Sequence, residues 1–206
     1  MAQTTPKAPR QPAFTPLREM IVDIADQLVA GNIVEDAGPN TDSGGMIAKF
    51  FEEGAGQRGG GGQMWCAAFA SYCIRKGIEA SGSTAFPIRF TASGPDTKKR
   101  LEQEGLFITI EELYEGKTDK EVGSPKETAR LPGPGDFVVF NTHHIGLVKS
   151  FDHKAKRLVT IEGNNTTDNG KKADGRTPAP DGVYEHNISA RRLATVLGFG
   201  IVDPAP

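Results

Sequence analysis

The stretch from Pro134 to Asn164, PGDFVVFNTHHIGLVKSFDHKAKRLVTIEGN, decides the fold class of this chain. After a turn, the apolar run Asp136–Phe140 predicts a buried strand. The segments His144–Phe151 and Arg157–Glu162 predict two further strands, and the polar residues between them are typical of a hairpin turn. Consecutive strands joined by short turns indicate an antiparallel β-meander.

Both flanks of this meander favour an α+β architecture. Upstream, the apolar residues of segment 17–30 recur at the spacing of an amphipathic helix, and a shorter helix is expected over 46–51. Downstream, segments 183–187 and 196–202 predict two more strands. Because helices precede strands instead of alternating with them, we expect N-terminal helices packed on a C-terminal antiparallel β-meander or half-barrel.

The middle of the chain carries weaker signals. Segment 96–104 predicts a short polar helix that ends at Gly105, and residues 107–113 favour an extended strand. From 115 to 134 the chain is polar and rich in Pro and Gly, which predicts a long surface connection. The stretch 82–134 carries no motif of its own, and we expect it to shape specificity.

Length and charge narrow the possible classes of protein. The 206 residues suffice for one domain, and we expect a flexible leader over 1–16 and a single domain over 17–206. With 24 basic and 26 acidic residues and no basic cluster, a nucleic-acid partner is not expected. No stretch approaches the ~18 apolar residues of a membrane helix, and the N-terminus lacks the apolar core of a Sec signal. We therefore predict that the protein does not insert into membranes. We also expect a monomer.

Residues 65–77, WCAAFASYCIRKG, predict a helix with one buried face that ends at Gly77. Cys66 lies in its first turn, where the N–H groups and the helix dipole favour a thiolate. It is therefore a candidate nucleophile, although most free cysteines are small buried apolar residues. Cys73 lies mid-helix, ~10 Å of helical rise away and beyond disulfide reach. We expect it in the core.

Candidate partners for this thiol come from the meander. His144 begins a strand and is a candidate general base, and Gly146 on the same face leaves room for the cysteine helix to approach. On the next strand, period two places Glu162 and Asn164 on one face. A carboxylate there can fix the imidazole tautomer, while the amide holds the ring or polarises a substrate. A polar strand end entering a loop is the alternative interpretation.

The other histidines are expected to lie away from the chemistry. His143 would point toward solvent or the second wall of a cleft, because neighbours in an extended chain face opposite ways. His153 in the hairpin turn and His186 near a late strand are expected to be solvated.

Four motifs in this order resemble the CHAP family, the amidase and peptidase branch of the NlpC/P60 papain-like superfamily. They are Trp65–Phe69, Pro134–Phe140, His144–Val148 and Thr160–Asn164. The upstream segment 35–40 also looks like the lead-in of such domains. The resemblance spans about residues 17–202 and implies a papain-like fold.

The resemblance implies a nucleophile, a base, an orienting acid and an auxiliary polar group, which are Cys66, His144, Glu162 and Asn164 in that order. It also implies a substrate cleft, to which we assign Asn40, Gln63, Trp65 and His143. Family members hydrolyse peptidoglycan at the muramoyl–L-Ala amide, within the stem peptide or in the cross-bridge. The acidic calcium loop of some members is absent, so no metal or other cofactor is expected.

Two other functions stay open from the residues alone. The chain could be an amidase for another small peptide or amide, or a non-catalytic wall-binding or assembly module on the same fold. Without a Sec signal, a wall hydrolase would reach the cell wall or periplasm through phage lysis or secretion-system injection. Delivery machinery and an immunity protein would then be its partners, beside its peptide substrate.

Overall fold

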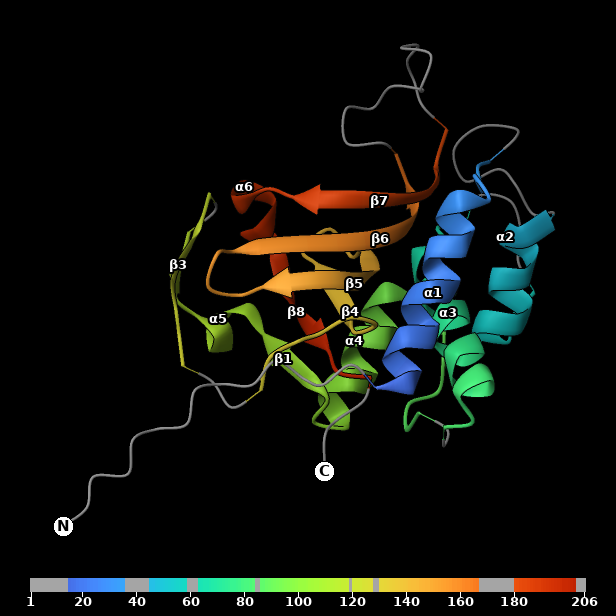
Figure 1. Cartoon of the computed structure of the whole chain (residues 1–206), viewed down its shortest axis with the longest axis horizontal. Coiled ribbons are helices and arrows are strands. Elements are labelled where there is room, and N and C mark those ends of the chain that lie inside the picture. Colours follow the sequence, from blue (N-terminus) through green and yellow to red (C-terminus); the bar gives the residue numbers. More distant parts are fainter. Residues whose placement is uncertain are drawn as a thin grey trace.

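The computed structural model describes residues 15–35, 45–58, 63–83, 86–118, 120–127, 130–166 and 180–202. In this part of the chain, N-terminal helices lie against a C-terminal antiparallel sheet, so the predicted α+β arrangement is confirmed (Figure 1). Most of the predicted leader falls outside the described residues. Within the described residues, no helix is both long and apolar enough to cross a membrane.

The first helices begin and end where local chemistry allows. Helix α1 (Pro16–Ala30) has Pro16 in its first turn, and the Thr15 side chain accepts from the N–H of Arg18 at 3.4 Å. Helix α2 (Gly45–Lys49) continues directly into the π-helix η1 (Phe50–Ala55). The helix predicted over 46–51 is therefore longer than the sequence indicated.

Helix α3 (Cys66–Ser81) carries the candidate nucleophile and runs one turn beyond its predicted end. Gly77 does not stop it; Gly82, at φ 65°, is the left-handed residue that follows the last turn. A Cβ on Gly77 would lie 2.5 Å from Cγ1 of Ile21, so this glycine lets α1 and α3 cross closely. The prediction of a helix end at Gly77 is wrong because the residue serves a tertiary contact.

The middle segment contains more regular structure than predicted. Helix α4 (Gly94–Gln103) is followed by β1 (Phe107–Thr109), and a capping box at Thr109 starts helix α5 (Ile110–Leu113). Residues 107–113 are thus only partly extended. The polar stretch predicted to be a plain surface connection instead contains a hairpin of β2 (Tyr114–Lys117) and β3 (Val122–Pro125).

The meander is confirmed and extends to one edge of the main sheet. Its strands follow in sequence order as β4 (Phe137–Phe140), β5 (Ile145–Asp152), β6 (Arg157–Asn165) and β7 (Gly182–Ile188). After the short helix α6 (Ala190–Leu193), β8 (Val196–Gly200) returns to pair with β4, and β1 pairs with β8. Among the described residues the order is β1-β8-β4-β5-β6-β7.

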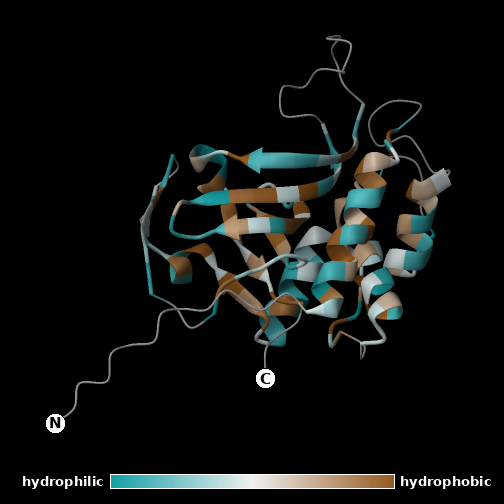
Figure 2. Ribbon diagram, in the orientation of Figure 1, coloured by the Kyte–Doolittle hydropathy of each residue, from teal (hydrophilic) through white to brown (hydrophobic). Residues whose placement is uncertain are grey.

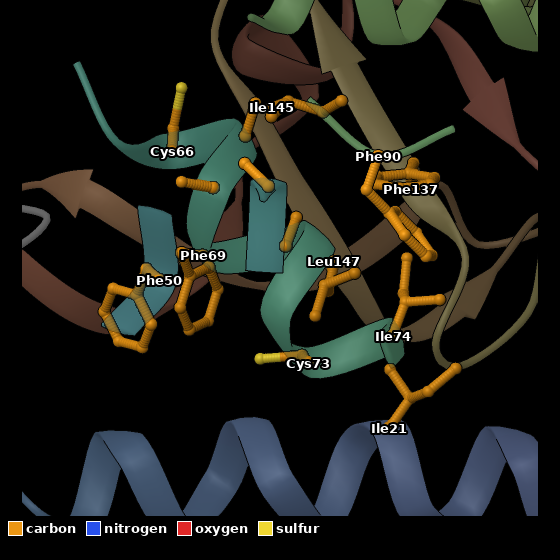
Figure 3. Packing of buried hydrophobic residues seen from close by; sticks show 14 of the residues in the cluster. Ile21, Phe50, Cys66, Phe69, Cys73, Ile74, Phe90, Phe137, Ile145 and Leu147 are labelled. Atoms are coloured by element: carbon orange, nitrogen blue, oxygen red, sulfur yellow. The ribbon is translucent and has the colours of Figure 1, made fainter. Parts of the chain in front are cut away.

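The sheet separates two apolar clusters. Phe137 and Val139 of β4 contribute to the cluster shared with α1, η1 and α3, while Val138 and Phe140 contribute to the cluster on the opposite face. This alternation follows from the period of two along a strand. Figure 2 shows hydrophobic residues in the central strands and hydrophilic ones along β3 and the edge strand β7. Helix α3 is enclosed between α1 and the sheet, which fixes the position of its first turn (Figure 3).

Candidate active site

Cys66 lies at the first turn of α3, at the bottom of a cleft of about 520 Å³. Only 3% of the residue is exposed, and its sulfur points away from Phe69 and Cys73 of the same helix (Figure 3). The first N–H groups of a helix have no partner within the helix, and the N–H of Ala67 hydrogen-bonds the Cys66 sulfur. Thiol and N–H groups are therefore directed to one place.

His144 is the residue immediately before β5. Its carbonyl accepts from the N–H of Phe140 at 2.9 Å, and its ring lies 5.8 Å from the Phe140 ring. The imidazole hydrogen-bonds the Cys66 thiol, and its Nε2 lies 2.8 Å from Oε2 of Glu162. Because Nε2 is taken by the carboxylate, Nδ1 is the nitrogen left for the sulfur.

Glu162 on β6 completes this chain of side chains. It is fully buried, and its Oε1 accepts from the hydroxyl of Thr160 at 2.5 Å. Space for it comes from Gly146, where a Cβ would lie 2.7 Å from Cγ of Glu162. The prediction that Gly146 admits the cysteine helix is therefore wrong. That close approach occurs at Gly163, where a Cβ would meet Phe69 and Trp65 at 2.7 Å.

The protonation states favour a charged pair. Burial alone would raise the pKa of Cys66, but the hydrogen bond and charge of His144 and the N–H groups of Ile145 and Ala67 outweigh it, so the pKa is lowered. Burial would lower the pKa of His144, but its bonds to Cys66 and Glu162 raise it to about 9. A lowered thiol pKa beside a raised imidazole pKa favours a thiolate–imidazolium pair over the neutral thiol and imidazole.

The same charges keep Glu162 ionised. Burial opposes ionisation, but the hydrogen bond from His144 and the charges of His144, Arg192 and His186 lower the pKa of Glu162 to about 2. The carboxylate can thus orient and stabilise the imidazolium over the whole range in which the protein would work.

Asn164 does not join this chain of side chains. The β6–β7 register shifts between Glu162 and Asn165, and Asn164 adopts φ 56°, so period two fails at this point. Asn165 is the amide that donates to Oε2 of Glu162. Asn164 instead accepts from the backbone N–H of Trp65 at 2.7 Å and so supports the start of α3. The structure places its side chain on the helix and not on the imidazole.

The residues assigned to substrate binding separate into different environments. Gln63 and His143 are exposed and line the cleft. Trp65 is fully buried: it stacks on Phe50 and donates its indole N–H to Glu35 at 2.6 Å. Its side chain therefore offers no surface to a ligand in this structure. Asn40 lies outside the described residues.

The cleft is lined by residues from separate segments of the chain. Its lining includes Gln57, Gln63 and Met64, which precede α3, and residues 91–96 with His143. Part of the segment 82–134 thus borders the cleft. A hollow of about 700 Å³ over residues 149–152 and 157–159 contains none of the thiol, imidazole or carboxylate groups described above.

Two histidines expected to be solvated are buried. His153 lies 2.8 Å from the carbonyl oxygen of Leu113 and against the rings of Tyr114 and Phe151. His186 on β7 is 1% exposed. In the part of the chain that the structure describes, no group of His, Cys, Asp and Glu side chains could hold a metal ion.

Sequence reasoning missed several residues that contact the site. Asn165 and Arg192 both donate to Glu162, and Glu35 holds the indole of Trp65. Glu35 begins the segment 35–40 that the resemblance singled out, but nothing in that segment indicates an indole partner. Arg192 lies outside the motifs, and no local pattern marks it. The adjacent amides Asn164 and Asn165 could have been recognised as alternatives, because one bulge exchanges their faces.

No protein-family model matches this sequence, and comparisons with curated proteins and with solved structures find no match either. The likeness to CHAP domains therefore rests on the motifs alone. The functional argument rests on the geometry of Cys66, His144 and Glu162.

Proposed function

We propose that this protein is a cysteine-dependent amide hydrolase that acts on the peptides of bacterial peptidoglycan. The observation that carries the proposal is the chain of side chains Cys66–His144–Glu162, with the thiol at a helix start and at the bottom of a cleft. This arrangement combines a nucleophile, a base and an orienting acid in the order that acyl transfer needs.

The first half of the reaction forms a thioester. The Cys66 thiolate attacks the amide carbonyl carbon, and N–H groups at the first turn of α3 stabilise the oxyanion. The imidazolium of His144 then gives its proton to the amide nitrogen as the C–N bond breaks, and the amine leaves. Glu162 keeps the ring in place throughout.

The second half releases the acyl group. A water molecule attacks the thioester carbonyl while neutral His144 takes its proton. The C–S bond breaks, the carboxylic acid leaves, and the thiolate–imidazolium pair returns. The narrow exposure of Cys66 limits the substrate to an extended chain or a small amide that can reach the bottom of the cleft.

The substrate class is supported by the motif resemblance to CHAP domains, and with it we propose a papain-like arrangement of helices and sheet. The α+β order, with the cysteine helix against the meander, is compatible with that fold. We further propose action on the wall after phage lysis or injection, with delivery machinery or an immunity protein as partners. Genes adjacent to the coding sequence would test this context.

Digestion of purified peptidoglycan tests the proposal, with mass spectrometry of the soluble products. We expect release by the wild type and by Cys73→Ala, which removes a buried thiol of the same helix, and none by Cys66→Ala. Product masses would separate cleavage at the muramoyl–L-Ala bond from cleavage within the peptide. Equal release by Cys66→Ala would refute the thiol mechanism, and no release by any folded variant would refute the peptidoglycan substrate.

A further inference from the structure

The buried carboxylate of Glu162 has a second cationic neighbour. Nη2 of Arg192 lies 2.6 Å from Oε2, the same oxygen that His144 contacts at 2.8 Å. The Glu162 side chain is fully buried, whereas that of Arg192 is 31% exposed. The arginine therefore reaches from the surface to a charge that water does not reach.

Local contacts hold Arg192 in this position. Its N–H donates to the Ser189 hydroxyl at 3.2 Å, and its carbonyl accepts from the Thr195 hydroxyl at 2.7 Å. Its guanidinium lies 5.0 Å from the centre of the Phe140 ring, which in turn contacts the ring of His144. An ordinary surface arginine, held by one exposed ion pair, lacks such constraints.

The charge balance explains why the site needs this cation. A thiolate, an imidazolium and a carboxylate together leave one net negative charge in a mostly buried place, which is costly without compensation. The guanidinium is permanently charged and makes the group neutral. Two titratable side chains also act on the group: His186 of β7 on Glu162, and Asp181, just before β7, on His144. Arg192 makes a direct ion pair with the carboxylate, at 2.6 Å.

We propose that Arg192 is a positioning residue that supplies the counter-charge for Glu162, so that the thiolate, imidazolium and carboxylate can all be charged at once. The inference rests on the proposed function, because it concerns the reactivity of the same thiol. It adds to that function a residue of α6, which joins the chain Cys66–His144–Glu162 at its Glu162 end.

The two possible roles of Arg192 predict opposite changes in pH dependence. The Cys66–His144 pair loses two protons, one at an acid inflection and one at an alkaline inflection. Each loss makes the site more negative, so removing a nearby cation moves both inflections to higher pH. If Arg192 only kept Glu162 in place, its loss would weaken the imidazolium instead. The alkaline inflection would then fall instead of rising.

The test is the pH dependence of Cys66 alkylation by iodoacetamide, located by mass spectrometry, on folded full-length protein. It requires no peptidoglycan. For Arg192→Gln we expect both inflections to rise by about half a pH unit or more. Arg192→Lys retains the charge and should stay close to the wild type. Arg191→Gln, which removes an exposed charge of the same helix, is the matched control and should change neither inflection.

Each other result of the alkylation experiment would overturn the proposal. Unmoved inflections in Arg192→Gln would rule out the charge effect. A fall of the alkaline inflection would reduce Arg192 to a support for the position of Glu162. A shift in Arg192→Lys as large as in Arg192→Gln would show that charge is not the cause. A wild-type profile like that of an ordinary thiol would overturn both this proposal and the thiol mechanism. Failure to digest peptidoglycan would leave these inflections unaffected and concern only the substrate.

Discussion

Cys66 and Cys73 are the same residue type on one helix in opposite electrostatic environments. The pKa of Cys66 is lowered by His144 and nearby N–H groups, whereas burial raises the pKa of Cys73. We therefore expect iodoacetamide at pH 7 to alkylate Cys66 at least roughly tenfold faster than Cys73. Peptide mapping of a timed reaction measures both rates. Equal rates in the folded protein would contradict the charged pair at Cys66.

Asn164 combines an unusual backbone conformation with a hydrogen bond to the helix that carries the nucleophile. At φ 56° a residue without Asn, Asp or Gly character is strained, and the side chain also accepts from Trp65 N–H. Asn164→Ala should lower the free energy of unfolding by about 1–3 kcal/mol. Asn164→Gly relieves the strain but also lacks the acceptor, so its free energy of unfolding should fall less than that of Asn164→Ala. Denaturant unfolding gives this order, and an Ala variant as stable as the Gly variant would contradict it.

At the scale of elements, α1 and α3 approach each other through a glycine. In an isolated helix Gly77→Ala would be favourable by up to about 1 kcal/mol. Here the new Cβ would lie 2.5 Å from Cγ1 of Ile21 and 3.2 Å from its backbone nitrogen, so we expect a net loss of about 1–3 kcal/mol.

A double-mutant cycle identifies the contact responsible. Ile21→Ala removes Cγ1, so Gly77→Ala should cost less in that background than in the wild type. Thermal or denaturant unfolding of the four proteins in the cycle measures the coupling. Equal costs in both backgrounds would place the clash elsewhere.

The elements that sequence predicted well are those whose pattern is local. The apolar periods of α1, α3 and the meander identified each of them and placed Cys66, His144 and Glu162 on suitable ends and faces. The failures are tertiary. Gly77 resembles a helix end until α1 is beside it, and the exchange of Asn164 for Asn165 depends on a bulge opposite β7. Arg192 reaches Glu162 only because the chain after β7 folds back, with α6 in contact with β7.

At the scale of the whole molecule, one buried ion pair joins the start and the end of the described chain. Nη1 of Arg18, in α1, lies 3.0 Å from Asp136 and donates to the carbonyl of Pro134 at 2.8 Å. Asp136 in turn accepts from the N–H groups of Gly133 and Val202 at 2.8 Å. The turn before the meander, the first helix and the last strand region thus share one carboxylate.

Removing Arg18 should destabilise the protein in a pH-dependent way. Arg18→Met leaves Asp136 charged and buried, which should cost about 3–5 kcal/mol near neutral pH. Burial already raises the pKa of Asp136 despite Arg18, and the substitution raises it further. Between the pKa of Asp136 in the unfolded state and its higher pKa in the folded state, the folded protein binds one proton more than the unfolded protein. The free energy of unfolding therefore falls as pH rises through this range. The cost relative to the wild type should therefore be smaller at pH 4 than at pH 7.

Denaturant unfolding of the wild type and Arg18→Met at both pH values measures this difference, since the other groups titrate in both proteins. Arg157→Met is the matched control, because it breaks the exposed pair with Asp152 and should change stability little at either pH. A cost of Arg18→Met that is equal at both pH values would mean that Asp136 is not the group left uncompensated. Lost packing of the Arg18 side chain, which is itself buried, would then account for the effect.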